Sequence, residues 1–283
     1  MGTIRLGALL GRNQSFEAFA DGPQGWVRES DQASFFRVDS VTAVHSSPYG
    51  LQAVVDSTGG AAAVLRYDYG TAGDAHVLWF PAVTTHTLHG TLWARAADAA
   101  SSGGLRWRLG GAVEALSAPI AHGAALAAYG LETVVASAAG LPTAGLVRVS
   151  AAMGPATVFV DDVLTVVDAL ALHPEWSLEE RAHLERSVHR TQEGRLHGYT
   201  WHRHAAFRVP LRWLSGLEAE RVNWWWEVQA PLAFTLDSSD AERVVPCLLV
   251  NDTQPVGRRI RPLADAWQGT LELAGLHDGR LAF

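Results

Sequence analysis

The feature that most constrains this fold is a strict alternation of side-chain types within short segments that turn-forming residues separate. In Thr87–Arg95, the small or apolar residues Leu88, Gly90, Leu92 and Ala94 occupy every second position. The positions between them hold Thr87, His89, Thr91, Trp93 and Arg95. A period of two places successive side chains on opposite faces, as in a β-strand with one buried face. With similar segments at Leu51–Val55 and His76–Phe80, the pattern predicts an all-β fold.

The alanine-rich stretch Ala121–Ala139 is the part of the first half that most invites a helix assignment. It contains Gly123 and Gly130 together with the β-branched run Thr133–Val135. Glycine weakens a helix and β-branched residues favour strands, so we expect broken strands here.

A domain boundary is predicted at Leu170–Pro174, dividing the chain into residues 1–170 and 171–283. Immediately beyond it, Ser177 and Glu180 have the spacing of a capping box, so a short linking helix is expected from about Leu178.

After this helix the strand pattern returns. Ser187–Arg190 and Arg195–Trp201 are predicted to form a hairpin. Phe207–Leu214 alternates strictly, which places Phe207, Val209, Leu211 and Trp213 on one face. A turn or short helical connection is expected at Ser215–Glu220. The remaining expected strands are Asn223–Glu227, Leu232–Leu236, Val244–Val250 and Thr270–Leu273.

Composition excludes several classes of protein. The chain has 283 residues, a net charge of -7 and no lysine, so a general basic face for nucleic acid and a P-loop lysine are both excluded. No apolar run approaches the roughly 20 residues that span a bilayer, and the first residues lack a full signal-peptide core. We therefore expect neither membrane insertion nor secretion through a signal peptide. Cys247, the only cysteine, lies in an apolar stretch and is interpreted as a buried small hydrophobe.

Two motifs bracket the first half. Asn13–Glu17 is followed by Gly25-Trp26, and Val158–Val163 carries the adjacent carboxylates Asp161 and Asp162. This bracket resembles the jelly-roll carbohydrate-binding modules of families 4, 9 and 22, which open on an Asn-x-x-Phe-Glu strand and close on an Asp-Asp-Val strand. The resemblance covers roughly residues 10–168 and implies a jelly-roll β-sandwich.

In those modules the glutamate of the first strand and an aspartate of the last often hold a structural calcium ion. Carried over, Glu17 with Asp161 or Asp162 would bind calcium, a role that oxygen ligands suit. The alternative is that these carboxylates cap strand ends or pair with arginines. Binding a glycan requires exposed aromatic rings, and Trp79, Trp93 and Trp107 are the candidates by strand position, although a strand tryptophan is more often core.

The second half resembles a tail or baseplate component of tailed bacteriophages or related particles. The resemblance rests on an ordered series over residues 185–275: the hairpin at Glu193–Tyr199, the strand Phe207–Leu214, the tryptophan-rich segment Asn223–Trp226, and the final Ala266–Leu273. It implies assembly with other tail proteins, in multiple copies and in a virion tail made in the host cytoplasm.

Trp224, Trp225 and Trp226 are candidates for the interface. Three adjacent indoles on a strand cannot all face one core, so at least one is expected at a subunit contact. Irregular backbone at Asn223 would instead allow all three to turn inward.

Catalytic motifs are not evident. His202 and His204 share a strand face and, with His189 or His197, are a candidate for a metal site or for an exposed polar face. Asp161 and Asp162 are adjacent on a strand and make a poor acid/base pair, and Gly-x-Ser-x-Gly is absent. We therefore predict a non-enzymatic structural protein of a phage-like tail or baseplate, with a jelly roll that takes part in attachment to a host-surface glycan. The alternative is a carbohydrate-binding module attached to a glycan-active enzyme domain.

Overall fold

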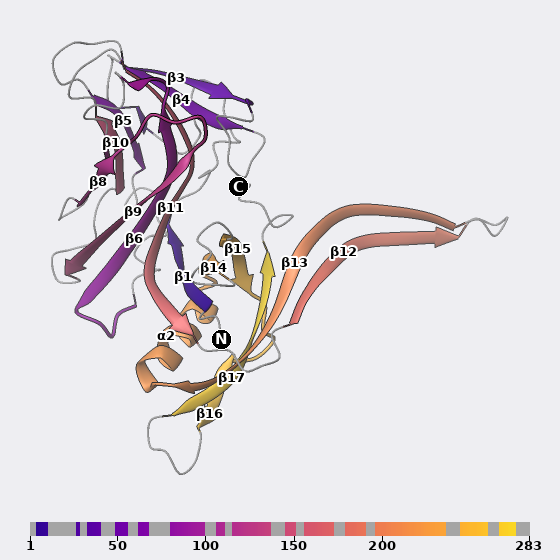
Figure 1. The fold of residues 1–283 in the computed structure, drawn as a ribbon. Helices are drawn as coiled ribbons and strands as arrows, with labels where there is room; N and C mark the ends of the chain where they lie inside the picture. The colour runs from indigo at the N-terminus through magenta and orange to yellow at the C-terminus, as the bar shows by residue number, and fades with distance from the viewer. Residues whose placement is uncertain are drawn as a thin grey trace. The chain divides into compact units, whose positions relative to one another are not determined.

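The computed structural model confirms the all-β class. It describes residues 4–10, 27–28, 33–40, 49–55, 62–67, 80–99, 106–110, 115–136, 145–150, 156–172, 179–190, 196–235, 244–259 and 266–275. These residues contain seventeen strands and helix α2, Gly216–Glu227 (Figure 1). Within the described part of the chain, no helix has both the length and the apolar character that a membrane span requires.

The chain divides into two compact units. One comprises Met1–Leu6 and Leu170–Arg280 and is called the 170–280 unit below. The other comprises Gly7–Ala169 and Leu281–Phe283 and is called the 7–169 unit. The strand β11, Ala156–Leu172, continues through part of the segment at which a linker was expected. Leu170 and Leu172 are buried apolar residues, so this segment extends a strand rather than forming an open connection.

The principal sheet of the 7–169 unit is organised around β11. The strand order is β9-β6-β11-β4-β3, and β1 is also hydrogen-bonded to β11. These strands span Ile4–Leu10 (β1), Ala33–Val38 (β3), Gly50–Val55 (β4), Thr85–Ala96 (β6) and Ala127–Ala136 (β9). The pairs β3–β4, β4–β11, β11–β6 and β6–β9 are antiparallel. Gly7 allows the close approach of β1, because a Cβ there would lie 2.4 Å from Val166 Cγ1.

A second sheet of the same unit has the order β2-β5-β10-β7-β8. Its strands are Val27–Arg28 (β2), Ala62–Tyr67 (β5), Arg106–Gly110 (β7), Ala115–Pro119 (β8) and Gly145–Ser150 (β10). Strand β5 contacts β3 and β4, and β8 contacts β9, so the two sheets belong to one packed body. The more specific assignment to a jelly roll stays a prediction.

The predicted alternation in β6 is confirmed. Leu88, Gly90, Leu92 and Ala94 are buried, whereas the intervening residues are only half-buried. The buried face continues across β11 and β4 through Val158, Val160, Leu51 and Ala53. The prediction of strands rather than a helix in Ala121–Ala139 is also confirmed, because β9 occupies Ala127–Ala136.

The 170–280 unit contains a sheet with the order β12-β13-β17-β15-β14, and β16 pairs with β17. The strands are Glu179–Arg190 (β12), Leu196–Leu214 (β13), Leu232–Thr235 (β14), Val244–Leu249 (β15), Val256–Arg259 (β16) and Trp267–Gly275 (β17). Gly269 permits the contact with the turn before β16, since a Cβ there would lie 2.1 Å from the carbonyl oxygen of Pro255.

The predicted helix after Ser177 is wrong, because Glu179–Arg190 forms β12. This strand pairs with β13 from Glu179, opposite Arg208, to Arg190, opposite Leu196. Leu184 and Val188 have the i, i+4 spacing that a helix also accepts, so the long pairing with β13, and not the local apolar pattern, selects the strand. The predicted hairpin is confirmed and is longer than expected, as Figure 1 shows for β12 and β13.

The predicted strand at Asn223–Glu227 is also wrong, because these residues form the C-terminal half of α2. Ser215 is the N-cap, and its hydroxyl accepts a hydrogen bond from the Glu218 backbone N–H (3.3 Å). The Glu218 carboxylate in turn accepts from the Ser215 backbone N–H (2.8 Å), which completes a capping box. Ala219, Val222 and Trp225 then form a buried stripe at helical spacing.

The predicted common face of β13 holds for Phe207, Val209 and Leu211 and fails for Trp213. The first three are at most 2% exposed, whereas Trp213 is 63% exposed. The register with β17 shifts between Leu211 and Leu214, and this β-bulge changes the face on which the next side chain lies.

Candidate functional site

The candidate functional site is the half-exposed face of the principal sheet of the 7–169 unit. We call it the aromatic–polar face and define it by the following residues: Phe36, Gln52, His89, Trp93, Arg95, Glu132 and Phe159. Strand register places them together, because residues directly opposite each other in an antiparallel pair share a face. Each is half-buried or exposed, in contrast to the buried opposite face.

One row of this face crosses four strands. Arg95 of β6 lies opposite Phe159 of β11, Phe159 lies opposite Gln52 of β4, and Gln52 lies opposite Phe36 of β3. Phe36 is 51% exposed, although phenylalanine is normally buried. The two phenylalanines are two strands apart, or roughly 10 Å at the usual strand spacing.

Arg95 is held in place by two contacts. Its guanidinium carbon lies 4.2 Å from the centroid of the Phe159 ring, a cation–π geometry. Its Nη1 donates to the carbonyl oxygen of Gly123 at 3.4 Å. The side chain is therefore positioned before any ligand arrives, which lowers the entropic cost of using it in binding.

Polar groups continue along β6 toward β9. His89 lies opposite Glu132, with 3.4 Å between His89 Nδ1 and Glu132 Oε2. Trp93 lies between this pair and Arg95, opposite Ala128 on one side and Asp161 on the other. The face therefore combines flat aromatic surface with donors and acceptors, the composition expected of a site for a polyhydroxylated ligand.

The three tryptophans predicted to bind glycan are not brought together on one sheet. Trp93 is on the aromatic–polar face, and Trp107 is on β7 in the second sheet, opposite Val149. Trp79 lies outside the described residues. Sequence reasoning did not single out Phe36, Gln52 and Phe159, because only cross-strand register reveals that they share a row with Arg95.

The predicted calcium ligands Asp161 and Asp162 are both fully buried in β11. The register with β6 shifts between Asp161 and Leu164, and Asp162 has a φ of 46°. Asp161 Oδ1 accepts a hydrogen bond from the Asp162 backbone N–H at 2.9 Å. The third predicted ligand, Glu17, lies outside the described residues. Among the residues whose positions are described, no group of three or more His, Cys, Asp or Glu side chains forms a metal site.

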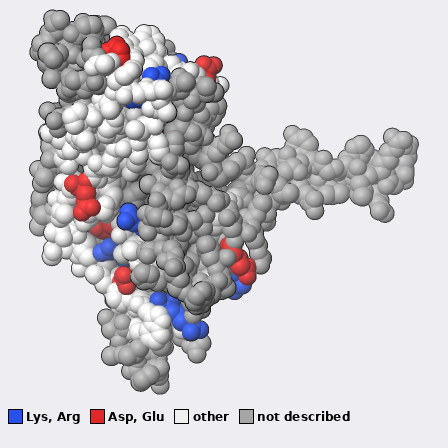
Figure 2. Space-filling view, in the orientation of Figure 1, with Lys and Arg blue, Asp and Glu red and all other residues white. Residues whose placement is uncertain are grey.

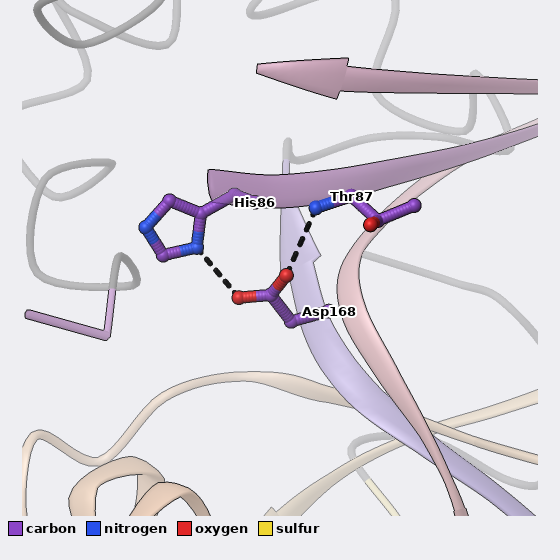
Figure 3. A network of polar contacts seen from close by, with 3 residues as sticks. All are labelled: His86, Thr87 and Asp168. Atoms are coloured by element: carbon purple, nitrogen blue, oxygen red, sulfur yellow. Dashed lines mark hydrogen bonds and ion pairs between the residues drawn. The ribbon is translucent and has the colours of Figure 1, made fainter. Parts of the chain in front are cut away.

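A buried imidazole–carboxylate pair, which the sequence did not reveal, joins the ends of β6 and β11 (Figure 3). His86 Nδ1 donates to Asp168 Oδ2 at 2.6 Å, and the Thr87 backbone N–H donates to Asp168 Oδ1 at 2.9 Å. Asp168 has a φ of 52°, which directs its carboxylate back toward the start of β6. His86 is 1% exposed and Asp168 is 8% exposed, so the pair joins two strands rather than presenting a reactive group.

The predicted interface tryptophans lie next to one another on α2, one buried and two half-buried. Trp225 is 1% exposed and belongs to the core. Trp226 is half-buried, and its Nε1 donates to the carbonyl oxygen of Asn251 at 2.8 Å. Trp224 is also half-buried. A helix separates adjacent side chains by about 100°, which resolves the crowding that a strand would have imposed.

The histidines of the β12–β13 hairpin and Cys247 are the remaining residues that the sequence singled out. In the β12–β13 register, His189 lies opposite His197, His202 opposite Glu185, and His204 opposite His183. Cys247 is fully buried in β15, as predicted, and burial raises the pKa of its thiol far above the ordinary value. The thiol is therefore not a nucleophile in the folded chain.

Comparisons with known proteins give only distant structural likeness. No protein-family model matches the chain, and no curated protein matches it. An arabinose-bound α-L-arabinofuranosidase, MgGH51, aligns with 14% identity and a TM-score of 0.40, covering 57% of this chain and 27% of the enzyme. The CBM22-1–GH10 modules of a Clostridium thermocellum xylanase, complexed with xylohexaose, align with 12% identity and a TM-score of 0.33, covering 54% and 27%. Likeness at this level identifies no family.

Proposed function

We propose that this chain is a structural component of a bacteriophage-like tail or baseplate, and that its 7–169 unit binds a glycan of the host surface. The observation that carries the binding role is the row Arg95–Phe159–Gln52–Phe36 across four paired strands. Its setting in a particle is supported by the motif series of residues 185–275, which lies within the 170–280 unit.

The row suits an extended neutral sugar chain. Aromatic rings stack on the apolar faces of sugar rings, and the amide of Gln52 between them offers both a donor and an acceptor to hydroxyl groups. Arg95, fixed against Phe159, offers further donors at one end of the row. The cross-strand arrangement predicts that the chain of sugars crosses the strands rather than running along them.

We also propose that Asp161 and Asp162, with Glu17, hold a structural calcium ion. Two fully buried carboxylates are costly unless they are paired or coordinate a cation, and oxygen donors are the ligands that calcium prefers. The ion would stabilise the bulge of β11, which begins at Asp161, two residues after Phe159 of the row. A rise in the melting temperature with added calcium, abolished in Asp162→Asn, is the expected result. An identical shift in the variant would contradict the role of Asp162.

A glycan array with the purified full chain tests the binding role. The parent chain is expected to bind a subset of glycans, and Phe159→Ala and Phe36→Ala are each expected to weaken binding about tenfold, the loss of one stacked ring. Leu116→Ala is the matched control, because Leu116 is 48% exposed on β8 of the second sheet and lies outside the aromatic–polar face. Equal binding by all four proteins would remove the aromatic–polar face from consideration.

Labelled electron microscopy of the parent particle tests the setting. An antibody against the chain is expected to decorate the tail or baseplate. The second candidate function, a carbohydrate-binding module of a glycan-active enzyme, is favoured by the same face and differs in its surroundings. Hydrolysis of an array-positive glycan by the intact polypeptide, with no decoration of the particle, would establish that alternative.

A further inference from the structure

The 170–280 unit presents an exposed tryptophan on strained backbone. Trp213 has a φ of 64° and is 63% exposed in the folded chain. Positive φ is a true outlier for a bulky side chain, and it recurs at functional positions. An exposed indole does not gain the free energy that burial of a large apolar side chain contributes.

A β-bulge is responsible for both features. Leu211 pairs with Gly269 and Leu214 pairs with Trp267, so Arg212 and Trp213 together oppose the single residue Gln268. Bulges of this kind reorient one side chain while leaving the flanking pairs intact. Leu211 and Leu214 are both buried although they are three residues apart, so the bulge turns Trp213 outward and leaves Arg212 exposed, where the alternation of the strand already placed it.

The surroundings of the indole are basic and polar. Arg212 is exposed beside it, and Gln268, the residue of β17 that the bulge faces, is half-buried. Figure 2 shows arginine side chains gathered at the end of this unit where β16 and β17 lie. A tryptophan flanked by arginine is the composition most enriched at the energetic centres of protein interfaces.

The distribution of charge along the chain indicates the partner. Residues 7–169 contain 8 arginines and 14 aspartates and glutamates, whereas the remaining residues contain 14 and 15. Three of those acidic residues, Asp161, Asp162 and Asp168, are buried; the other 11 still exceed the 8 arginines by three, so the excess of negative charge remains larger in the 7–169 unit than in the rest of the chain. Because Trp213 is uncovered within its own chain, a complementary surface must come from another molecule.

We propose that Trp213 is the anchor of an interface between copies of this chain, and that it seats on the acidic 7–169 unit of a neighbouring copy. The contact joins two different surfaces, so it is heterologous and builds a ring or a stack rather than an isolated dimer. This inference rests on the proposed role in an assembled particle, because it identifies the surface that multiple copies would use.

Sedimentation velocity of the full chain over a concentration series tests the proposal. The parent chain is expected to self-associate, and the association is expected to weaken as salt rises because charges contribute to it. Trp213→Gly is expected to weaken self-association about 30-fold, the usual loss at an energetic centre. The melting temperature of this variant is expected to be no lower than the parent's, because glycine removes the strain at positive φ.

Gln229→Gly provides the matched control. Gln229 is also exposed and also has a positive φ, 52°, at the end of α2. Glycine there should relieve strain equally while leaving self-association unchanged. Trp213→Asn is a second variant, because asparagine tolerates this backbone conformation and removes the indole.

The seat on the neighbouring copy is identified by cross-linking. A photoreactive residue in place of the exposed Leu217, in the first turn of α2, is introduced into unlabelled chain and mixed with ¹⁵N-labelled chain. Mixed-isotope cross-links are expected to peptides of residues 7–169, and cross-links to residues 170–280 would overturn the proposed seat. A parent chain that stays monomeric, or a Trp213→Gly chain that associates as the parent does, would overturn the interface itself. Decoration of the particle by the antibody in either of those cases would leave the tail role standing, so the two failures are distinguishable.

Discussion

The two units differ in how they accommodate polar groups. In the described residues, every polar or charged side chain in the buried class belongs to the 7–169 unit: His86, Ser117, Thr133, Asp161, Asp162, Thr165 and Asp168. The 170–280 unit has an apolar interior containing Trp225, Phe234 and Cys247. Its partly buried polar contacts include those of the neutral amides Asn223 and Asn251. We infer that substitutions that reduce packing destabilise the 170–280 unit most. Substitutions that remove the partner of a buried polar or charged group should destabilise the 7–169 unit most.

Trp225→Ala tests the apolar side of this comparison and has the largest expected effect. Trp225 is among the largest fully buried side chains, and the phenylalanine rings of Phe207 and Phe234 pack in the same core with centroids 5.0 Å apart. Replacing a buried tryptophan by alanine typically costs about 3–5 kcal/mol through lost transfer energy and a residual cavity. Urea denaturation followed by tryptophan fluorescence measures the change in the free energy of unfolding. Trp224→Ala, at a half-buried neighbour, is the control and should cost distinctly less; equal costs would contradict the assignment of Trp225 to the core.

Asp168→Ala tests the contribution of the buried polar and charged groups in the 7–169 unit. The substitution removes the acceptor for both His86 Nδ1, which is buried, and the Thr87 backbone N–H, which is partly buried. An orphaned buried donor costs about 1–3 kcal/mol, so we expect a loss of about 3 kcal/mol in the free energy of unfolding. The change should appear as increased hydrogen exchange in β6 and β11, with little change in β13 and β17. Uniform loosening of both units would contradict the difference between them.

Asn251→Ala tests the neutral polar contacts of the 170–280 unit. The Asn251 side chain donates to the Thr270 carbonyl at 2.8 Å and accepts from the Glu272 backbone N–H at 2.9 Å. The side chain thereby pairs with backbone groups of β17 in the way that a neighbouring strand would. Losing both bonds at a partly buried site should cost about 2 kcal/mol.

Asn223 offers a control of the same chemistry, since its side chain bonds both backbone groups of Val256 at 2.8 and 3.1 Å. Alanine at either position should have a similar cost, with no dependence on calcium or on salt. A salt-dependent loss would show that charges contribute to this contact.

Whether a sequence prediction succeeded depended on whether the information it required was local in the sequence. The alternation in Thr87–Arg95 is local, so the face it buries could be predicted. The row through Phe36, Gln52 and Phe159 depends on register between strands far apart in the chain, and no local pattern encodes it. Trp213 was misplaced for a related reason. A bulge adds one residue without changing the apparent alternation, so the sequence continues to place Trp213 on the face of Leu211 although the register has shifted.

Ser215→Ala and Ser177→Ala form the final pair and carry the smallest expected effect. Both serines precede a glutamate by three residues, the sequence of a capping box. At Ser215 the box is made, and α2 follows with a buried stripe of Ala219, Val222 and Trp225. Beyond Ser177 the chain instead forms β12, which pairs with β13 from Glu179 to Arg190. Tertiary packing therefore decides between two similar local signals.

Alanine at position 215 is expected to cost about 1 kcal/mol, the usual value of an N-cap, and alanine at 177 is expected to cost nothing measurable. Chemical denaturation of the two variants, compared with the parent, gives both values. Ser215→Asp should restore most of the stability lost on substitution by alanine, because aspartate caps helices as well as serine does. An equal loss at the two serines would mean that a helix forms after Ser177 as well, and it would contradict the pairing of β12 with β13.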